Sequence, residues 1–203
     1  PLVIAGHSIG GMTMSAIPEV RPDLVPRLAG LLFVSTSSGA MDTVTLGLPE
    51  MGRTVRGQIP RVLSARARMM SRSTRRRSPA IERQVMRRFV FGRDARPRDV
   101  GLAVDQIINC PPATLSGFYR DCMRHERTAG LPSYDGIPTT VLVGSRDLLT
   151  PPAHARRIAQ HIRGARLVVA PEAGHMLPLE RDALVTGELI GLVEGALARR
   201  RPR

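Results

Sequence analysis

The sequence predicts an α/β protein in which a parallel sheet is flanked by helices. The apolar run at residues 28–34 lacks polar alternation, as expected for a parallel strand that is covered on both faces. Strand-like and helix-like segments alternate near both ends of the chain, which implies parallel strands joined by helices. Residues 40–132 between them carry helical patterns and no strand signal. We therefore expect a core segment at 1–39, a helical cap insertion at 40–132 and a second core segment at 133–203.

The first core segment opens with a short apolar strand, Leu2–Ala5, that runs directly into Gly6-His7-Ser8-Ile9-Gly10. A helix is expected from Ile9 to Ile17, because its apolar residues are spaced to face a sheet. Pro18 should shorten or kink this helix, since proline removes a hydrogen bond and clashes one turn back. The next strand is expected at 28–35.

The insertion is expected to contain several short helices, most of which begin at a proline. Ser78 and Pro79 supply the cap and first residue of one helix, which Gly92 closes. The others are expected over 60–71, 97–109 and 114–126. In the last of these, Leu115, Phe118, Cys122 and Met123 are expected to face inward.

The second core segment returns to strand and helix signals. Because active residues of such sheets gather at the carboxyl ends of the strands, the loops that follow each strand are the segments to search. The expected order is a strand at 139–144, a loop at 145–152, a helix at 152–161, a strand at 167–169 and a final helix at 181–198.

Composition excludes several classes of protein. The chain has 203 residues, of which 42% are hydrophobic, enough for one sizeable core. All 30 residues counted as Lys or Arg are arginine, and the formal net charge is +13. Aromatic residues make up only 3% and no nucleic-acid-binding motif is present, so no specific nucleic-acid partner is expected. No apolar run is long enough to span a membrane. We expect a cytoplasmic location and leave the oligomeric state open.

Metal and disulfide chemistry are not expected either. Two cysteines, Cys110 and Cys122, lie outside any CxxC pattern and form no disulfide framework. His125, His154 and His161 show no ligand-like clustering. The sequence therefore predicts no metal and no cofactor.

The motif G-x-S-x-G lies between the first strand and the first helix, where it forms a tight turn that presents a serine. Ser8 is therefore the candidate nucleophile. We expect Gly6 and Gly10 because a Cβ at either position would collide with the neighbouring backbone. The backbone N–H of Ile9, in the first turn of the helix, is the candidate donor to a developing oxyanion. The alternative is that Ser8 only caps a helix.

Two further candidates follow later strands. Asp147 lies in the loop after the strand at 139–144, and His175 lies in the loop after the strand at 167–169. The order serine, acid, histidine is that of a catalytic triad on a parallel sheet. Asp147 can instead cap the next helix, and His175 can be a surface residue. Asp135 is a rival acid that precedes its strand, and His7 is expected to pack at the turn without acting as the base.

These motifs resemble the α/β-hydrolase superfamily, and within it the bacterial esterase and lipase-like members. The resemblance rests on the segments at 6–11, 144–147 and 174–180 and covers nearly the whole chain, with 40–132 in the place of the family's helical cap. It implies a serine hydrolase that cleaves carboxylic esters through an acyl-enzyme, with a small-molecule ester as substrate. A serine nucleophile argues against the branches that use aspartate at this position.

The chain departs from the family in one respect. Similar proteins carry strands before the turn and a loop that donates a second oxyanion N–H, and nothing here corresponds to that loop. Losing one such donor costs about 10²–10³ in turnover. We therefore expect the chain to be a fragment that is poorly folded and nearly inactive alone, with an apolar sheet edge exposed at its first strand. The sequence leaves as alternatives a catalytically silent binding module, a basic nucleic-acid-binding protein, and a perhydrolase, thioesterase or lyase on the same triad.

Overall fold

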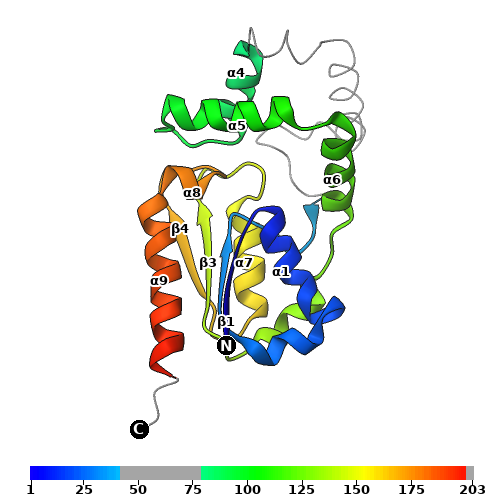
Figure 1. The fold of residues 1–203 in the computed structure, drawn as a ribbon, viewed down its shortest axis with the longest axis vertical. Helices are drawn as coiled ribbons and strands as arrows, with labels where there is room; N and C mark the ends of the chain where they lie inside the picture. The colour runs from blue at the N-terminus through cyan, green and yellow to red at the C-terminus, as the bar shows by residue number, and fades with distance from the viewer. Residues whose placement is uncertain (42–78, 200–203) are drawn as a thin grey trace.

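A four-stranded parallel sheet forms the centre of the computed structural model, which describes residues 1–41 and 79–199. The strands lie in the order β1-β2-β3-β4. Their bounds are Leu2–His7 for β1, Leu28–Val34 for β2, Thr139–Gly144 for β3 and Arg166–Ala170 for β4. The predicted fold class, a parallel sheet flanked by helices, is confirmed (Figure 1).

The sheet is covered on both faces, and consecutive residues of β2 point to opposite sides. Leu31 and Phe33 pack with α1 (Ile9–Val20), the 3₁₀ helix η3 (Thr128–Tyr134) and α7 (Pro152–His161). Leu32 and Val34 pack on the other side with α9 (Asp182–Ala198). All four side chains are 2% exposed or less. This two-sided burial explains why the strand shows no polar alternation in the sequence.

Three helices of the predicted insertion lie beyond the carboxyl ends of the strands (Figure 1). They are α4 (Ala80–Phe89), α5 (Pro97–Asn109) and α6 (Pro112–Arg124). The short helix α8 (Leu177–Glu180) lies beneath them and the 3₁₀ helix η1 (Pro22–Arg27) precedes β2. A second apolar cluster joins Val104 and Ile108 of α5 to Leu149 and Met176 of the core loops. The helix expected at 60–71 lies outside the described residues, and the division into three parts stays a prediction.

Pro18 does not shorten helix α1, because the helix continues through this proline to Val20; a kink at Pro18 stays a prediction. Proline cannot donate the backbone bond that the Met14 carbonyl would accept in a regular helix. The hydroxyl of Tyr134 donates to that carbonyl instead, at 2.6 Å. Burial raises the pKa of Tyr134, so its hydroxyl keeps this proton. The lost helical bond is thus replaced by a tertiary one.

Helix α6 corrects a second expectation. Cys122 and Met123 pack against Met12 and Met41, as expected of inward-facing residues. Phe118 does not, because its side chain is 50% exposed. Helical spacing alone gave the wrong face for this residue.

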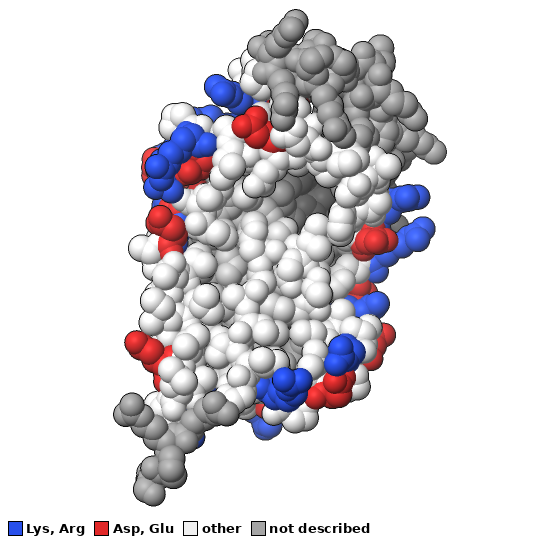
Figure 2. All heavy atoms as spheres, in the orientation of Figure 1, with Lys and Arg blue, Asp and Glu red and all other residues white. Residues whose placement is uncertain are grey.

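The first strand is an edge strand in the described part of the chain, since β1 pairs there with β2 alone. Leu2 at its start is 37% exposed. Figure 2 shows charged side chains mainly around the outline of this face and few across its middle, where β1 lies in front in Figure 1. The exposed apolar edge expected at the first strand is therefore present in the described part of the chain.

Replacing Tyr134 with Phe should lower the free energy of unfolding by about 1–3 kcal/mol, because the buried Met14 carbonyl loses its donor. In a Pro18→Ala background the cost should be smaller, since the alanine introduced there can supply the helical N–H. Urea denaturation of the four proteins measures both costs. Equal costs in the two backgrounds would contradict this account of Pro18.

Candidate active site

The turn between β1 and α1 holds Ser8 in a strained backbone conformation. Its φ is 53° and its ψ is −117°, a region that costs a non-glycine residue about 1–3 kcal/mol. Two hydrogen bonds hold the turn: the Ser8 N–H donates to the Val34 carbonyl at 3.0 Å, and the Thr36 hydroxyl donates to the Ser8 carbonyl at 2.6 Å. The end of β2 and the loop after it therefore fix the serine at the carboxyl edge of the sheet.

The glycines of this turn have different reasons to be glycine. A Cβ on Gly6 would lie 2.5 Å from the carbonyl carbon of Gly10, so the turn cannot close with a larger residue there. A Cβ on Gly11 would lie 2.5 Å from the Thr36 side chain. The expectation for Gly10 is wrong, because a Cβ there would meet nothing within 4 Å. Gly11 is needed because the helix packs there against the loop after β2.

Three candidate side chains meet at the carboxyl edge of the sheet. His175 Nε2 lies 2.9 Å from Ser8 Oγ, and His175 Nδ1 lies 3.0 Å from Asp147 Oδ2. His175 is 4% exposed and Asp147 is 2% exposed. An ionised carboxylate can only accept, so Nδ1 carries the ring proton and Nε2 is left to accept from the serine hydroxyl. This arrangement allows the imidazole to take a proton from Ser8.

The Asp147 carboxylate is fixed by its own loop. Its Oδ1 accepts the N–H groups of Leu149 and Thr150 at 3.0 and 2.8 Å, and its Oδ2 accepts the Thr150 hydroxyl at 2.9 Å. Burial alone would raise the pKa of the carboxyl, but the facing His175 ring and these hydrogen bonds outweigh it, so the pKa of Asp147 is lowered. The group is therefore ionised at neutral pH, as an acceptor for the imidazole must be.

The loop that carries His175 is held by hydrogen bonds to the segment after α4 and to Glu180 of α8. The His175 N–H donates to the Val90 carbonyl at 2.7 Å. The Glu180 carboxylate accepts the N–H of Gly92 at 2.7 Å and that of Gly174 at 3.0 Å. The first two of these bonds join the segment after α4 to the histidine loop and to α8, and the third joins the histidine loop to α8. No local pattern in the sequence indicates these contacts.

Gly92 does not close α4, which ends at Phe89, and this corrects a further expectation. Its φ is not positive, as the common glycine cap requires. A Cβ on Gly92 would lie 2.1 Å from the Glu172 carbonyl oxygen. The glycine is needed because the chain after α4 passes directly against the histidine loop.

His7 lies beside the candidate base. Its Nε2 is 2.8 Å from the His175 carbonyl oxygen, so this nitrogen donates, and the two ring centroids are 5.0 Å apart. Burial, with a smaller contribution from the His175 ring, lowers the pKa of His7 to about 4. The side chain is therefore neutral at neutral pH and supports the backbone of His175.

The remaining candidates occupy other places. Ile9 is the first residue of α1, where backbone N–H groups lack an acceptor within the helix; its role as an oxyanion donor and the lack of a second donor stay predictions. Asp135 precedes β3 and accepts the Arg163 N–H at 2.7 Å, away from the carboxyl edge. His154 lies 2.8 Å from the Ser37 hydroxyl. Among the described residues, no three His, Cys, Asp or Glu side chains form a group that could hold a metal ion.

His7 should make the stability of the protein sensitive to acid. The unfolded side chain binds a proton below about pH 6.5, whereas the folded one does so only near pH 4, so the free energy of unfolding falls as the pH falls through this window. A His7→Gln variant can donate to the same carbonyl without titrating. Its stability should fall less by pH 4, the difference being roughly 2–3 kcal/mol. Denaturation at several pH values measures this, and parallel curves for the two proteins would contradict it.

Solved structures with the same fold include three enzymes of bacteria. An esterase from Thermogutta terrifontis, solved with malate bound, has 23% sequence identity and a TM-score of 0.70, covering 96% of this chain and 65% of its own. The enol-lactonase from Burkholderia xenovorans has 23% identity and a TM-score of 0.69, covering 95% and 65%. An esterase from Exiguobacterium antarcticum has 16% identity and a TM-score of 0.66, covering 95% and 66%. The chain thus spans less than two thirds of the length of these three proteins.

No curated protein matches the sequence. Within the described residues, no helix is both long enough and apolar enough to cross a lipid bilayer. The profile of the Alpha/beta hydrolase family matches residues 1–187. Together with the parallel sheet and the turn at Ser8, this match over most of the chain places the protein in the α/β-hydrolase family.

Proposed function

We propose that this chain is a serine hydrolase that cleaves carboxylic esters through an acyl-enzyme. Ser8 is the nucleophile, His175 the general base and Asp147 the acid that orients it. One observation carries the proposal. In the buried imidazole of His175, one nitrogen lies 2.9 Å from the serine oxygen and the other lies 3.0 Å from a carboxylate oxygen of Asp147. Neutral serine is a weak nucleophile, and such a contact is what activates it.

The first half of the reaction forms the acyl-enzyme. Ser8 Oγ attacks the ester carbonyl carbon while His175 Nε2 takes the hydroxyl proton. The carbonyl oxygen becomes an oxyanion, which the Ile9 N–H stabilises. When the intermediate collapses, the carbon–oxygen bond of the leaving group breaks and His175 returns the proton to the departing alcohol. Asp147 stabilises the imidazolium that exists between these two proton transfers.

The second half regenerates the enzyme. Water attacks the acyl carbon and gives a proton to His175, and the bond between Ser8 Oγ and the acyl carbon then breaks as the proton passes to Ser8. Every group in both halves belongs to the chain, to the ester or to water, so the sequence of steps needs no cofactor.

Esters are proposed as the substrate class for two reasons. Acyl transfer is the chemistry of a serine, histidine and aspartate arranged in this order. Two of the structural neighbours are esterases and one is an enol-lactonase, and a lactone is a cyclic ester. At these identities the neighbours support only the class of bond and not the acyl group.

In a protein with the strands expected before the turn restored, replacing Ser8 with Ala should lower kcat/KM for a short-chain nitrophenyl ester by on the order of 10⁴ or more, because no other group in the site can form the acyl-enzyme. The matched control is Ser116→Ala on α6, where the hydroxyl donates to the Ala113 carbonyl. That variant should keep the activity of the unchanged protein. Equal activity of the Ser8→Ala variant and the control would favour a catalytically silent binding module.

Replacing Asp147 with Asn should lower kcat by about 10²–10⁴ with little change in KM, because the amide no longer stabilises the imidazolium and favours the wrong tautomer of His175. Steady-state kinetics on the same ester measures the two constants separately. A variant that loses affinity for the ester and keeps kcat would contradict the role proposed for Asp147.

A further inference from the structure

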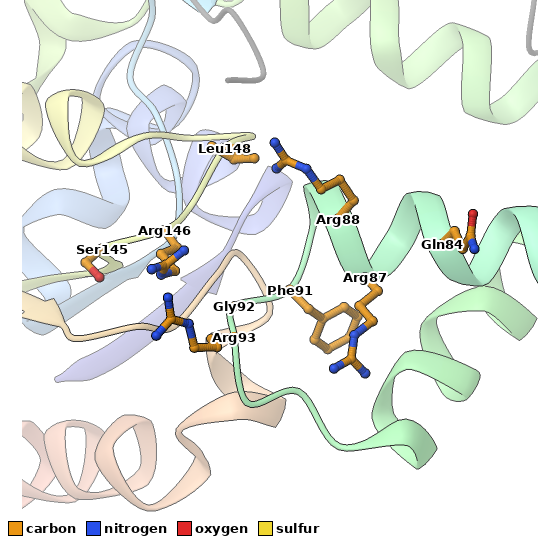
Figure 3. Close-up of a pocket in the computed structure, with 9 residues that line it drawn as sticks. All are labelled: Gln84, Arg87, Arg88, Phe91, Gly92, Arg93, Ser145, Arg146 and Leu148. Carbon is orange, nitrogen blue, oxygen red and sulfur yellow. The ribbon is translucent and has the colours of Figure 1, made fainter. Parts of the chain in front are cut away.

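A cavity of about 820 Å³ lies between the end of α4, the segment at 91–93 and the loop at 145–148 (Figure 3). Four of the residues that line it are arginines: Arg87, Arg88, Arg93 and Arg146. Among the described residues, no acidic side chain lines it. Neither Ser8 nor His175 belongs to its lining, so the cavity is separate from the serine and histidine of the candidate active site.

In the described structure, one carboxylate pairs with two of the four guanidinium groups. Glu172 lies 2.7 Å from Arg146 and 3.7 Å from Arg93, and these two arginines face one another in Figure 3. Among the described residues, neither Arg87 nor Arg88 has a carboxylate within ion-pair distance. Like charges held around one cavity repel, and an anion placed between them removes that cost.

The neutral residues of the lining indicate the other chemical groups that a ligand would carry. Leu148 adds apolar surface beside the arginines, whereas Phe91 is 5% exposed and contributes little. Ser145 Oγ accepts the Glu172 N–H at 2.8 Å, which leaves the serine proton to donate. The volume is far larger than an inorganic anion needs. The cavity therefore offers hydrogen-bond donors for negative groups and an apolar surface for a carbon skeleton.

We propose that this cavity is a binding site for a small organic dianion with a flat apolar body, either a phosphate ester or a dicarboxylate. Arginine is suited to both headgroups because its planar fork binds phosphate and carboxylate with two parallel hydrogen bonds. Arg88, which has no carboxylate partner in the described structure and points toward Leu148 in Figure 3, binds the headgroup, and Leu148 contacts the body. Arg87, which also has no carboxylate partner there, points to the other side and adds positive charge to the cavity. The site does not depend on the hydrolase proposed above, since it uses neither its nucleophile nor its base.

Calorimetric titration at low ionic strength and neutral pH tests the proposal with three ring compounds. Phenyl phosphate and phthalate carry the two kinds of dianionic headgroup, and phenol carries the ring without the charge. At least one dianion should bind the full chain, and the tighter of the two identifies the headgroup. Phenol should not bind measurably. Binding of phenol as tight as that of the dianions, or no binding of either dianion, would overturn the proposal.

Two double variants separate the site from the general basicity of the chain. Arg87→Gln with Arg88→Gln should weaken binding of the dianion about tenfold or more. Arg120→Gln with Arg124→Gln removes the same charge from exposed positions on α6 and should change it about twofold or less. Equal weakening by both pairs would show generic attraction and overturn the proposal.

Two further variants test the role of the guanidinium shape and the independence of the cavity from Ser8. Arg87→Lys with Arg88→Lys keeps the charge and loses the planar fork, so its affinity should lie between those of the unchanged protein and the glutamine pair. Ser8→Ala should bind the dianion as the unchanged protein does. Ester hydrolysis and dianion binding can therefore fail separately, and circular dichroism of each variant verifies that it is folded.

Discussion

The parallel pairing of the four strands brings the candidate site together. His7 pairs with Val34 at the carboxyl end of β1, and Gly144 pairs with Ala170 at the carboxyl end of β3, so the loops after these strands leave the sheet at one edge. Ser8 and His175 are 167 residues apart in the chain and 2.9 Å apart in space. An antiparallel partner at any position would carry one of these loops to the opposite edge. Each apolar contact that stabilises the sheet therefore also supports the geometry of the site.

The imidazole depends on more than its own loop. The carbonyl of His175 accepts a hydrogen bond from His7, and the N–H of His175 donates to the Val90 carbonyl. The Glu180 carboxylate accepts the N–H groups of Gly92 and Gly174, which neighbour these residues in the chain. Charge-assisted hydrogen bonds of this kind are stronger than neutral ones. The segment after α4 thus helps to hold the candidate base, and the same segment lines the arginine cavity. A shift of this segment would therefore change both the position of the candidate base and the lining of the cavity.

The sequence was sufficient for the features that local patterns encode. The ends of the strands were predicted to within one or two residues, because each strand is a short, mostly apolar run that serine or proline follows. The nearness of Ser8, Asp147 and His175 followed from their places after three such strands, while their roles remain our proposal. Two of the errors, at Pro18 and Gly92, share one cause, which is that the partner is distant in the chain. Pro18 is tolerated because Tyr134 replaces its bond, and Gly92 is needed because Glu172 lies against it. Neither partner can be found from spacing along one helix.

Covalent labelling of Ser8 tests the central claim, that the contact with His175 turns this serine into a nucleophile. In a reaction with a fluorophosphonate, Ser8 Oγ would bond to phosphorus, fluoride would leave and His175 would take the proton. Peptide mass spectrometry of the labelled chain should find one adduct, on Ser8, and that adduct should be lost in a His175→Ala variant. Labelling of Ser8 that is unchanged in the variant, or the absence of any adduct on Ser8, would contradict the account.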